Sequence, residues 1–134
     1  MEKIDSKNIP QSHFFLPHHC VFTIDSSTTK LRVVFDASVK GSSNLSLNDI
    51  LLNAPVVQDD LFLILARFRF PTYAFSADLA KMYRKNLVSE SDKNLKLVLW
   101  RNHPSEPFSV YRLNTVTYGT KPAPYLATMY STNC

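Results

Sequence analysis

The sequence predicts one domain with a mixed α+β fold, and three observations support this. Two pairs of short segments rich in β-branched and aromatic residues, 20–24 with 31–35 and 95–100 with 108–113, are each joined by turn-prone residues. One apolar stripe at helical spacing lies between the pairs, in residues 61–68. The expected order is β-β-α-β-β-β-α, which lacks the regular alternation of parallel α/β units. We therefore expect antiparallel hairpins flanked by helices.

The chain has 134 residues, which suffice for one compact domain and are too few for two ordinary ones. Hydrophobic residues make up 45% of it, including nine Phe, six Tyr and one Trp, so a packed core is expected. Residues 1–13 are mostly polar, and we expect a flexible N-terminal segment there, followed by a single domain over residues 14–134.

Neither secretion nor membrane insertion is indicated. Two cysteines, Cys20 and Cys134, do not make a disulfide framework, and residues 1–10 contain no apolar signal-peptide core. The longest apolar run, residues 61–66, is far shorter than a membrane span. We expect a soluble protein of a reducing compartment such as the cytoplasm, without a membrane partner.

The first predicted hairpin joins residues 20–24 to residues 31–35 through the turn-prone residues 25–29, and residues 40–44 form a loop. Pro55 then opens the predicted helix. Its apolar stripe comprises Leu61, Ile64, Leu65 and Phe68, and Pro71 ends it.

Asp59 and Asp60 fall in the first turns of this helix, where the macrodipole stabilises acids by about 0.3–1 kcal/mol each. We interpret them as helix-start residues and not as a catalytic pair of aspartates, which in a polymerase lies in a tight turn between strands.

A strand over residues 72–77 is predicted next, with Asp78 at its end and a short helical turn through Met82. In the second hairpin, Leu95, Leu97 and Leu99 alternate with their neighbours, and residues 103–107 connect to the return strand at 108–113. A loop from Asn114 leads into a last helix near Pro122.

Several common sites are excluded by their missing motifs. The chain has only two glycines, Gly41 and Gly119, so a Gly-rich phosphate loop of the Rossmann or P-loop type is absent. No Gly-x-Ser-x-Gly or Cys-x-x-Cys motif occurs. A zinc site at His13, His18, His19 and Cys20 is disfavoured, because no second ligand pair follows at the required spacing.

Charge is unevenly distributed along the chain. The net charge is +4, and Arg67, Arg69, Lys81, Arg84 and Lys85 form a basic zone in which Asp78 is the only acid. Such a zone suits a site that binds phosphates together with a metal ion. A solvated basic face explains the same charges equally well.

Asp78 and Tyr83 are the strongest candidates for chemistry. A carboxylate at the end of a rigid strand can hold a divalent ion, and the backbone of residues 79–82 could then approach a triphosphate. Tyr83 could place its ring against a sugar. An exposed aspartate at a strand end together with a core tyrosine accounts for the spacing about as well.

Lys30 and Arg32 lie two residues apart on a predicted strand and therefore share a face. An arginine fork beside a lysine point charge binds phosphate oxygens well, although two such residues can also be an ordinary exposed pair.

The chain resembles the reverse transcriptase of BEL/Pao-type LTR retrotransposons, from about Phe14 onward and in the same order. The matching segments are residues 15–22 (FLPHHCVF), 30–38 (KLRVVFDAS), 45–52 (LSLNDILL), 58–61 (QDDL), 78–84 (DLAKMYR) and 113–120 (LNTVTYGT). The resemblance implies a partial right-hand polymerase fold, namely the fingers hairpin plus part of the palm sheet with flanking helices. It implies an RNA-directed DNA polymerase, which is a nucleotidyltransferase.

The resemblance also implies residue roles. Lys30 and Arg32 would contact the incoming nucleotide from the fingers, as would the backbone of Leu79 and Ala80. Asp78 would be the first metal-binding aspartate, and Tyr83 the steric gate against a ribose 2′-hydroxyl. Tyr118 and Gly119 fall where many retroviral relatives have Gln-Gly, so Tyr118 departs from that wider pattern. Asn48 would lie near the template.

The Tyr-x-Asp-Asp type hairpin of this family, which supplies the other carboxylates of a two-Mg²⁺ site, would lie beyond Cys134. We therefore expect this chain to be inactive alone and to expose an unpaired edge and an apolar patch. Its expected partners are an RNA or DNA template-primer and a deoxynucleoside triphosphate. The alternatives are a non-catalytic nucleic-acid-binding remnant, or a remnant without function or partner that scarcely folds.

Overall fold

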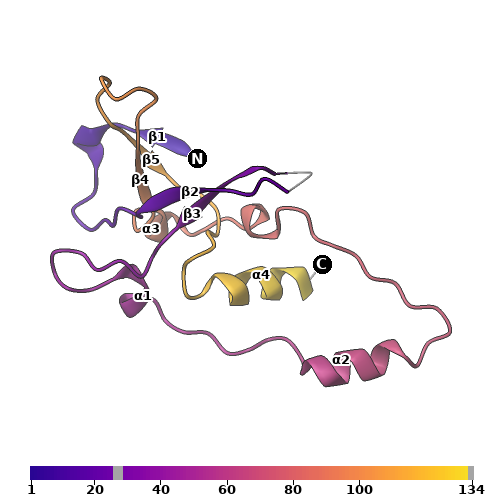
Figure 1. Ribbon diagram of the computed structural model, residues 1–134. Helices are drawn as coiled ribbons and strands as arrows, with labels where there is room; N and C mark the ends of the chain where they lie inside the picture. Colours follow the sequence, from indigo (N-terminus) through magenta and orange to yellow (C-terminus); the bar gives the residue numbers. More distant parts are fainter. Residues whose placement is uncertain (26–28, 133–134) are drawn as a thin grey trace.

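The computed structural model describes residues 1–25 and 29–132, with side chains to residue 130, as two antiparallel sheets and four α-helices (Figure 1). One sheet has the strand order β1 (Glu2–Ile4), β5 (Ser109–Arg112), β4 (Leu97–Trp100), and the other pairs β2 (His18–Phe22) with β3 (Leu31–Phe35). The helices are α1 (Leu47–Ile50), α2 (Leu61–Phe68), α3 (Glu90–Lys93) and α4 (Ala123–Thr132), with single 3₁₀ turns η1 (Ser6–Asn8) and η2 (Met82–Lys85). The mixed α/β class with antiparallel sheets is therefore confirmed.

Both predicted hairpins are present. In the first, β2 and β3 pair in antiparallel register with Cys20 opposite Val33, and the ladder extends to a bond from the Thr23 amide to the Lys30 carbonyl of 2.9 Å. Of the turn predicted at 25–29, residues 26–28 lie outside the described part of the chain. In the second hairpin, β4 and β5 pair with Leu99 opposite Val110.

The N-terminal segment differs from the flexible tail that we expected over residues 1–13. Glu2–Ile4 forms β1, which pairs with β5 on the side away from β4, with Lys3 opposite Tyr111. The Glu2 carboxylate also pairs with the Arg112 guanidinium at 2.8 Å. The sequence does not predict β1, because this strand is three residues long and its partner lies more than a hundred residues away.

The core joins the two sheets to α1. Its buried members are Leu16, Ala37, Leu47, Val98 and Leu113. α1 begins at a capping box that the sequence prediction overlooked: the Asp49 amide donates to the Ser46 hydroxyl at 3.2 Å, and the Ser46 amide donates to the Asp49 carboxylate at 2.9 Å. This box fixes the chain direction at the base of the hairpin and brings Leu47 into the core.

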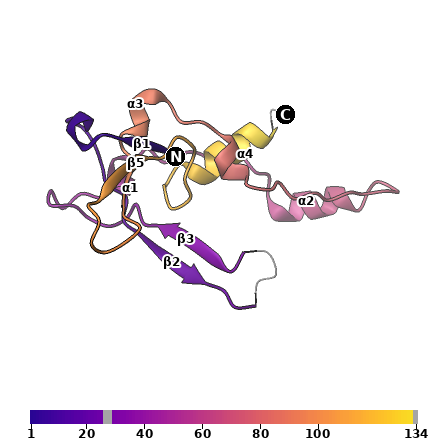
Figure 2. The same ribbon diagram turned by 90° about the horizontal axis from the view of Figure 1, so that it is seen from above.

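Helix α2 begins at Leu61, later than the predicted start at Pro55. Asp60 is its N-cap and accepts a hydrogen bond of 2.8 Å from the Phe62 amide, so its interpretation as a helix-start residue is confirmed. The helix ends at Phe68, before Pro71. None of its residues is buried, and Figures 1 and 2 show the helix well separated from both sheets. The apolar side chains of α2 are therefore exposed; the patch expected from the missing hairpin concerned the sheet and not this helix.

The predicted strand over residues 72–77 is wrong. This segment is irregular and exposed throughout, so Asp78 does not lie at the end of a strand. β-branched and aromatic residues favour a strand only where another strand can satisfy the backbone, and no described segment pairs with these residues. The helical turn expected after Asp78 is η2, and the last helix expected near Pro122 is α4.

Among the described residues, no helix is long and apolar enough to cross a membrane.

Candidate nucleotide-binding groove

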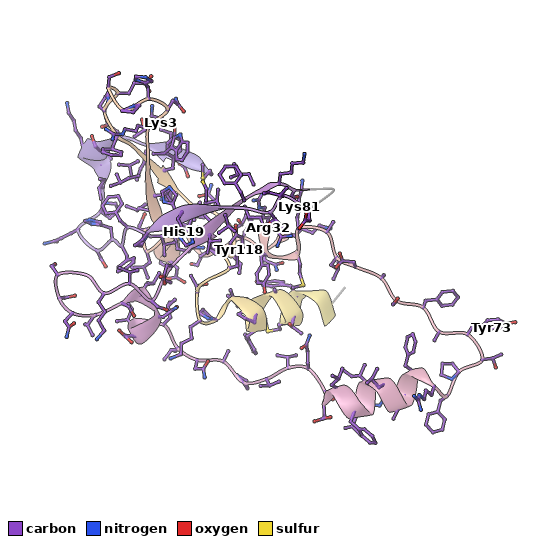
Figure 3. All side chains as sticks on the ribbon, viewed as in Figure 1. Lys3, His19, Arg32, Tyr73, Lys81 and Tyr118 are labelled. Carbon is purple, nitrogen blue, oxygen red and sulfur yellow. The ribbon has the colours of Figure 1, made fainter. Side chains whose placement is uncertain are left out.

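An open groove of about 800 Å³ lies between the hairpin β2–β3 and the segment that leads into η2. The hairpin contributes Thr29 and Arg32. The other wall is formed by Ala77, Asp78, Leu79, Lys81, Met82, Tyr83 and Arg84. Figure 3 shows Arg32 and Lys81 close together at this place, with Tyr118 beside them and Tyr73 far away. We refer to this space as the Asp78 groove.

One residue in the wall of the groove has a left-handed backbone conformation. Lys81 has φ +57° and ψ +33°, a conformation that costs an L-residue about 1–2 kcal/mol. Directly after it the chain enters η2, where the Arg84 amide donates to the Lys81 carbonyl at 2.8 Å. The reversal at Lys81 brings Asp78 and Tyr83, five residues apart, to the same groove.

The charges in the groove are of opposite sign and unequal number. Arg32, Lys81 and Arg84 are the lining cations, and Asp78 is the one carboxylate among the lining residues. All four side chains are exposed, so water screens them and the groove remains open to a charged ligand. The three cations favour an anionic ligand, and the carboxylate favours a metal cation bound to that ligand.

Two aromatic rings support the inner end of the groove. Tyr83 is half-buried and contacts Tyr118 edge-on, with ring centroids 6.3 Å apart and planes at 72°. Tyr118 in turn packs on Phe35 at 5.7 Å. The Tyr118 hydroxyl donates a hydrogen bond to the Val33 carbonyl of β3. Tyr118 thus supports the Tyr83 ring. Its hydroxyl proton is used in the hydrogen bond to the hairpin, so it does not serve a ligand.

The loop that carries Tyr118 is fixed by its neighbours. Gly119 has φ +91°, and a Cβ at this residue would lie 2.3 Å from the Phe35 carbonyl oxygen. The Asn48 side-chain amide donates to the Gly119 carbonyl at 3.1 Å and to Ser38 Oγ at 3.0 Å. Asn48 Oδ1 accepts from the Lys121 amide at 2.8 Å. Asn48 therefore ties α1 to this loop.

The structure brings together most of the residues that the sequence singled out. Arg32, Asp78, Leu79 and Tyr83 line one groove. Tyr118 adjoins them through the Tyr83 ring, and Gly119 and Asn48 stand behind Tyr118. Lys30 and Ala80 flank lining residues without lining the groove themselves. The irregular, exposed backbone at Asp78 is the main difference from the expected geometry.

Lys81 and Arg84 were not assigned a role from the sequence, although both belong to the basic zone noted there. Arg84 also lines a second cavity, of about 590 Å³, between the hairpin and the three-stranded sheet. This cavity is lined by aromatic groups that include His18, Phe35 and Trp100. His18 packs within 6.2 Å of both of these rings, measured between centroids. Its ring therefore has a packing role.

Metal ligands in the groove are few. Within residues 1–25 and 29–132, no cluster of three or more His, Cys, Asp or Glu side chains could enclose a metal ion. Mg²⁺, however, is commonly held by one or two carboxylates together with the phosphates of its substrate. Asp78 fits that chemistry for one ion that a nucleotide carries in, and it does not suffice for two ions.

No protein-family model matches this chain, and no curated protein sequence matches it.

Proposed function

We propose that this chain is the fingers-and-palm part of an RNA-directed DNA polymerase, and that the Asp78 groove takes the incoming deoxynucleoside triphosphate. The observation that carries the proposal is the joint presence of Arg32, Asp78 and Tyr83 in one groove, contributed by segments more than forty residues apart. Together they offer a phosphate fork, an ion ligand and a flat surface for a sugar.

The triphosphate is the part of the ligand that the charges favour. The Arg32 guanidinium can bind two phosphate oxygens at once, and Lys81 and Arg84 add point charge on the opposite wall. Because the hairpin supplies Arg32 and the η2 segment supplies the other two, a bound triphosphate would bridge the walls of the groove. Its affinity should therefore fall as the salt concentration rises.

Asp78 would hold the ion that accompanies the phosphates. A bound Mg²⁺ would neutralise charge on the phosphate oxygens during nucleotide transfer. In this site the Asp78 carboxylate lies among three cations. The groove would therefore bind the complex of nucleotide and Mg²⁺ more tightly than the nucleotide alone. Transfer itself requires more carboxylates than Asp78, so we infer nucleotide binding, without polymerisation, for these residues on their own.

Tyr83 would contact the sugar. Its ring is held edge-on by Tyr118, which is itself anchored to β3, so it cannot easily turn aside. A rigid ring at this place disfavours an extra hydroxyl at the 2′ position. In template-directed synthesis, the primer 3′-hydroxyl would attack the α-phosphate of the nucleotide that these residues position, and pyrophosphate would leave.

Isothermal titration of the chain with a deoxynucleoside triphosphate tests the proposal. We expect binding with Mg²⁺ and at least about tenfold weaker binding with a chelator, since the cation ligates both partners. Asp78→Asn should remove this Mg²⁺ dependence, and Arg32→Ala should weaken binding in both conditions. Tyr83→Val should reduce the preference for deoxyribonucleotides over ribonucleotides.

Two matched variants serve as controls. Asp25→Asn removes an exposed carboxylate that does not line the groove, and Arg101→Ala removes a cation that stacks on Phe108, 4.5 Å from the ring centroid. Neither should change nucleotide affinity. Binding that is unaffected by Asp78→Asn and Arg32→Ala would refute the assignment of the groove.

A non-catalytic nucleic-acid-binding remnant is the second candidate, favoured by the aromatic rings next to the cations of Arg32 and Arg84. It predicts salt-sensitive binding to single strands that is indifferent to Mg²⁺ and to Asp78→Asn. The same titration, repeated with a single-stranded oligonucleotide, separates the two functions.

A further inference from the structure

An apolar cavity of about 330 Å³ is lined by residues of α1, of the segment around α3 and of α4. Most of its wall is aliphatic and includes Ile50, Leu51, Leu95, Val116 and Leu126. Ile50 is 54% exposed, so the cavity can be reached from solvent. A cavity of this size and polarity suits a small, mostly apolar ligand.

One amine belongs to this apolar wall, and we therefore call the space the Lys96 cavity. Lys96 lines it and is only 6% exposed. Its Nζ donates to the Thr115 carbonyl at 2.7 Å. Thr117, which also lines the cavity, donates from its hydroxyl to the same carbonyl at 3.1 Å. Within residues 1–25 and 29–130 the amine has no second hydrogen bond and no ion pair, so a ligand in the cavity would not have to displace one.

The surroundings of Lys96 favour the neutral amine. Burial lowers the pKa of Lys96 to about 8, Asp92 opposes part of this shift, and the positive charge of Lys93 adds to it. At pH 8 about half of an amine with a pKa of about 8 is neutral, against less than about 1% of an ordinary lysine with a pKa of about 10.4. Only the neutral amine has the free electron pair that a nucleophile needs, and a lysine in an apolar pocket is activated in this way.

We propose that Lys96 is a covalent binding site for aliphatic aldehydes, whose hydrocarbon chain lies among the aliphatic side chains of the Lys96 cavity. Nζ attacks the carbonyl carbon and forms a C–N bond, which gives a carbinolamine. The carbonyl oxygen then leaves as water with the two hydrogens of the neutral amine, and a C=N bond remains. The step needs no oxidant or reductant, and water reverses it.

The lining selects the class of aldehyde. Lys96 and Asp92 are the two charged residues among the described lining residues, so a carboxylate on the ligand would meet the negative charge of Asp92. A neutral hydrocarbon chain is favoured instead, because each methylene that leaves water improves binding by roughly fourfold. The proposal is independent of the function of the Asp78 groove, since none of the described residues lines both spaces.

Reductive trapping with hexanal tests the proposal. Sodium cyanoborohydride reduces the C=N bond to a stable hexylamine, and peptide mass spectrometry locates the modified lysines. At a pH of about 8 we expect Lys96 to be modified at least about tenfold faster than Lys3 and Lys7, two exposed lysines outside the cavity. Concentrated urea should abolish this preference, because the unfolded chain has no cavity. Glyoxylate, an aldehyde with a carboxylate and no hydrocarbon chain, should show no preference for Lys96.

A variant at the exposed part of the lining tests whether the aldehyde reaches Lys96 through the cavity. Ile50→Gln makes this part polar and should slow the modification of Lys96 by hexanal at least about threefold. Because Ile50 is half-exposed, circular dichroism should show the variant folded. Ile24→Gln, at a side chain that is 88% exposed elsewhere, is the matched control and should leave the rate unchanged.

Three results would overturn the proposal. The first is modification of Lys96 by hexanal that is no faster than that of Lys3 and Lys7. The second is a preference for Lys96 that persists in urea or with glyoxylate. The third is an equal rate in wild type and Ile50→Gln, which would mean that hexanal does not use the cavity.

Discussion

Gly119 shows how a single residue holds the candidate site together. Its φ of +91° and the 2.3 Å between a hypothetical Cβ and the Phe35 carbonyl oxygen leave no room for a side chain. The adjacent Tyr118 is thereby placed against both Phe35 and Tyr83. The position of the Tyr83 ring therefore depends on a glycine that never touches the groove.

We expect Gly119→Ala to lower the free energy of unfolding by about 1–3 kcal/mol, since it adds backbone strain and a steric clash. Urea denaturation followed by circular dichroism measures this loss. Gly41→Ala is the matched control, because the nearest atom to its added Cβ lies 3.7 Å away, an ordinary contact, and its stability should stay within about 0.5 kcal/mol of wild type. Equal stabilities of the two variants would contradict the described geometry at Gly119.

The ionisable side chain of Lys96 is buried. The residue is 6% exposed, and its ammonium donates to the Thr115 carbonyl at 2.7 Å. Burial lowers the pKa of Lys96 to about 8, from an ordinary value of 10.5, while Asp92 opposes part of this shift. The folded protein therefore binds this proton less tightly than the unfolded chain does.

Between pH 8 and pH 10.5 the unfolded chain holds more protons at this site, so stability should rise with pH in that window. We expect a gain of about 3 kcal/mol in the free energy of unfolding from this residue across that window, at about 1.4 kcal/mol per pKa unit. Lys96→Met keeps the length of the side chain and should remove the rise. Parallel curves of melting temperature against pH for the two proteins would refute the assignment to Lys96.

Among the elements, the two hairpins were predictable and β1 was not. A hairpin is encoded by neighbouring residues, since alternating apolar positions and turn-prone residues lie within some twenty positions of each other. β1 is specified by contact with β5, and the exposed Glu2 and Lys3 give no apolar signal. α1 has only four residues, too few for helical periodicity, although its Ser46–Asp49 capping box could have been recognised.

For residues 72–77 the sequence predicted a strand that the structure does not contain. Their strand-forming composition was clear, but a strand needs a partner, and composition does not supply one. The residues of the candidate site were predictable as a set because each carries a distinct chemistry. Their meeting in one groove depends on the left-handed turn at Lys81, and a lysine gives no sequence signal for such a turn.

We expect the deletion of residues 1–5 to lower the free energy of unfolding by about 1–3 kcal/mol, because it removes the β1–β5 ladder. Hydrogen exchange should become faster at the amides of β5. Glu2→Gln, which removes the charge of the Glu2–Arg112 pair but keeps a side-chain oxygen that can accept from Arg112, is the control and should have a smaller effect than the deletion. Unchanged exchange at β5 after the deletion would show that β1 does not pair there.

On the scale of the whole molecule, two surfaces stand out on separate parts of the chain. The Asp78 groove is lined by cations from the hairpin and from the segment around η2, and α2 presents exposed apolar side chains. The net charge of +4 favours anionic ligands at the first surface.

Paramagnetic broadening of backbone amide signals by Mn²⁺ and a deoxynucleoside triphosphate tests the nucleotide groove most directly. If Asp78 and Arg32 face one bound nucleotide, Mn²⁺ in place of Mg²⁺ should broaden residues 77–84 and residues 29–33 together, and Asp78→Asn should abolish both effects. Broadening centred on the acids of α3, or confined to one of the two segments, would contradict the groove as the site of nucleotide binding.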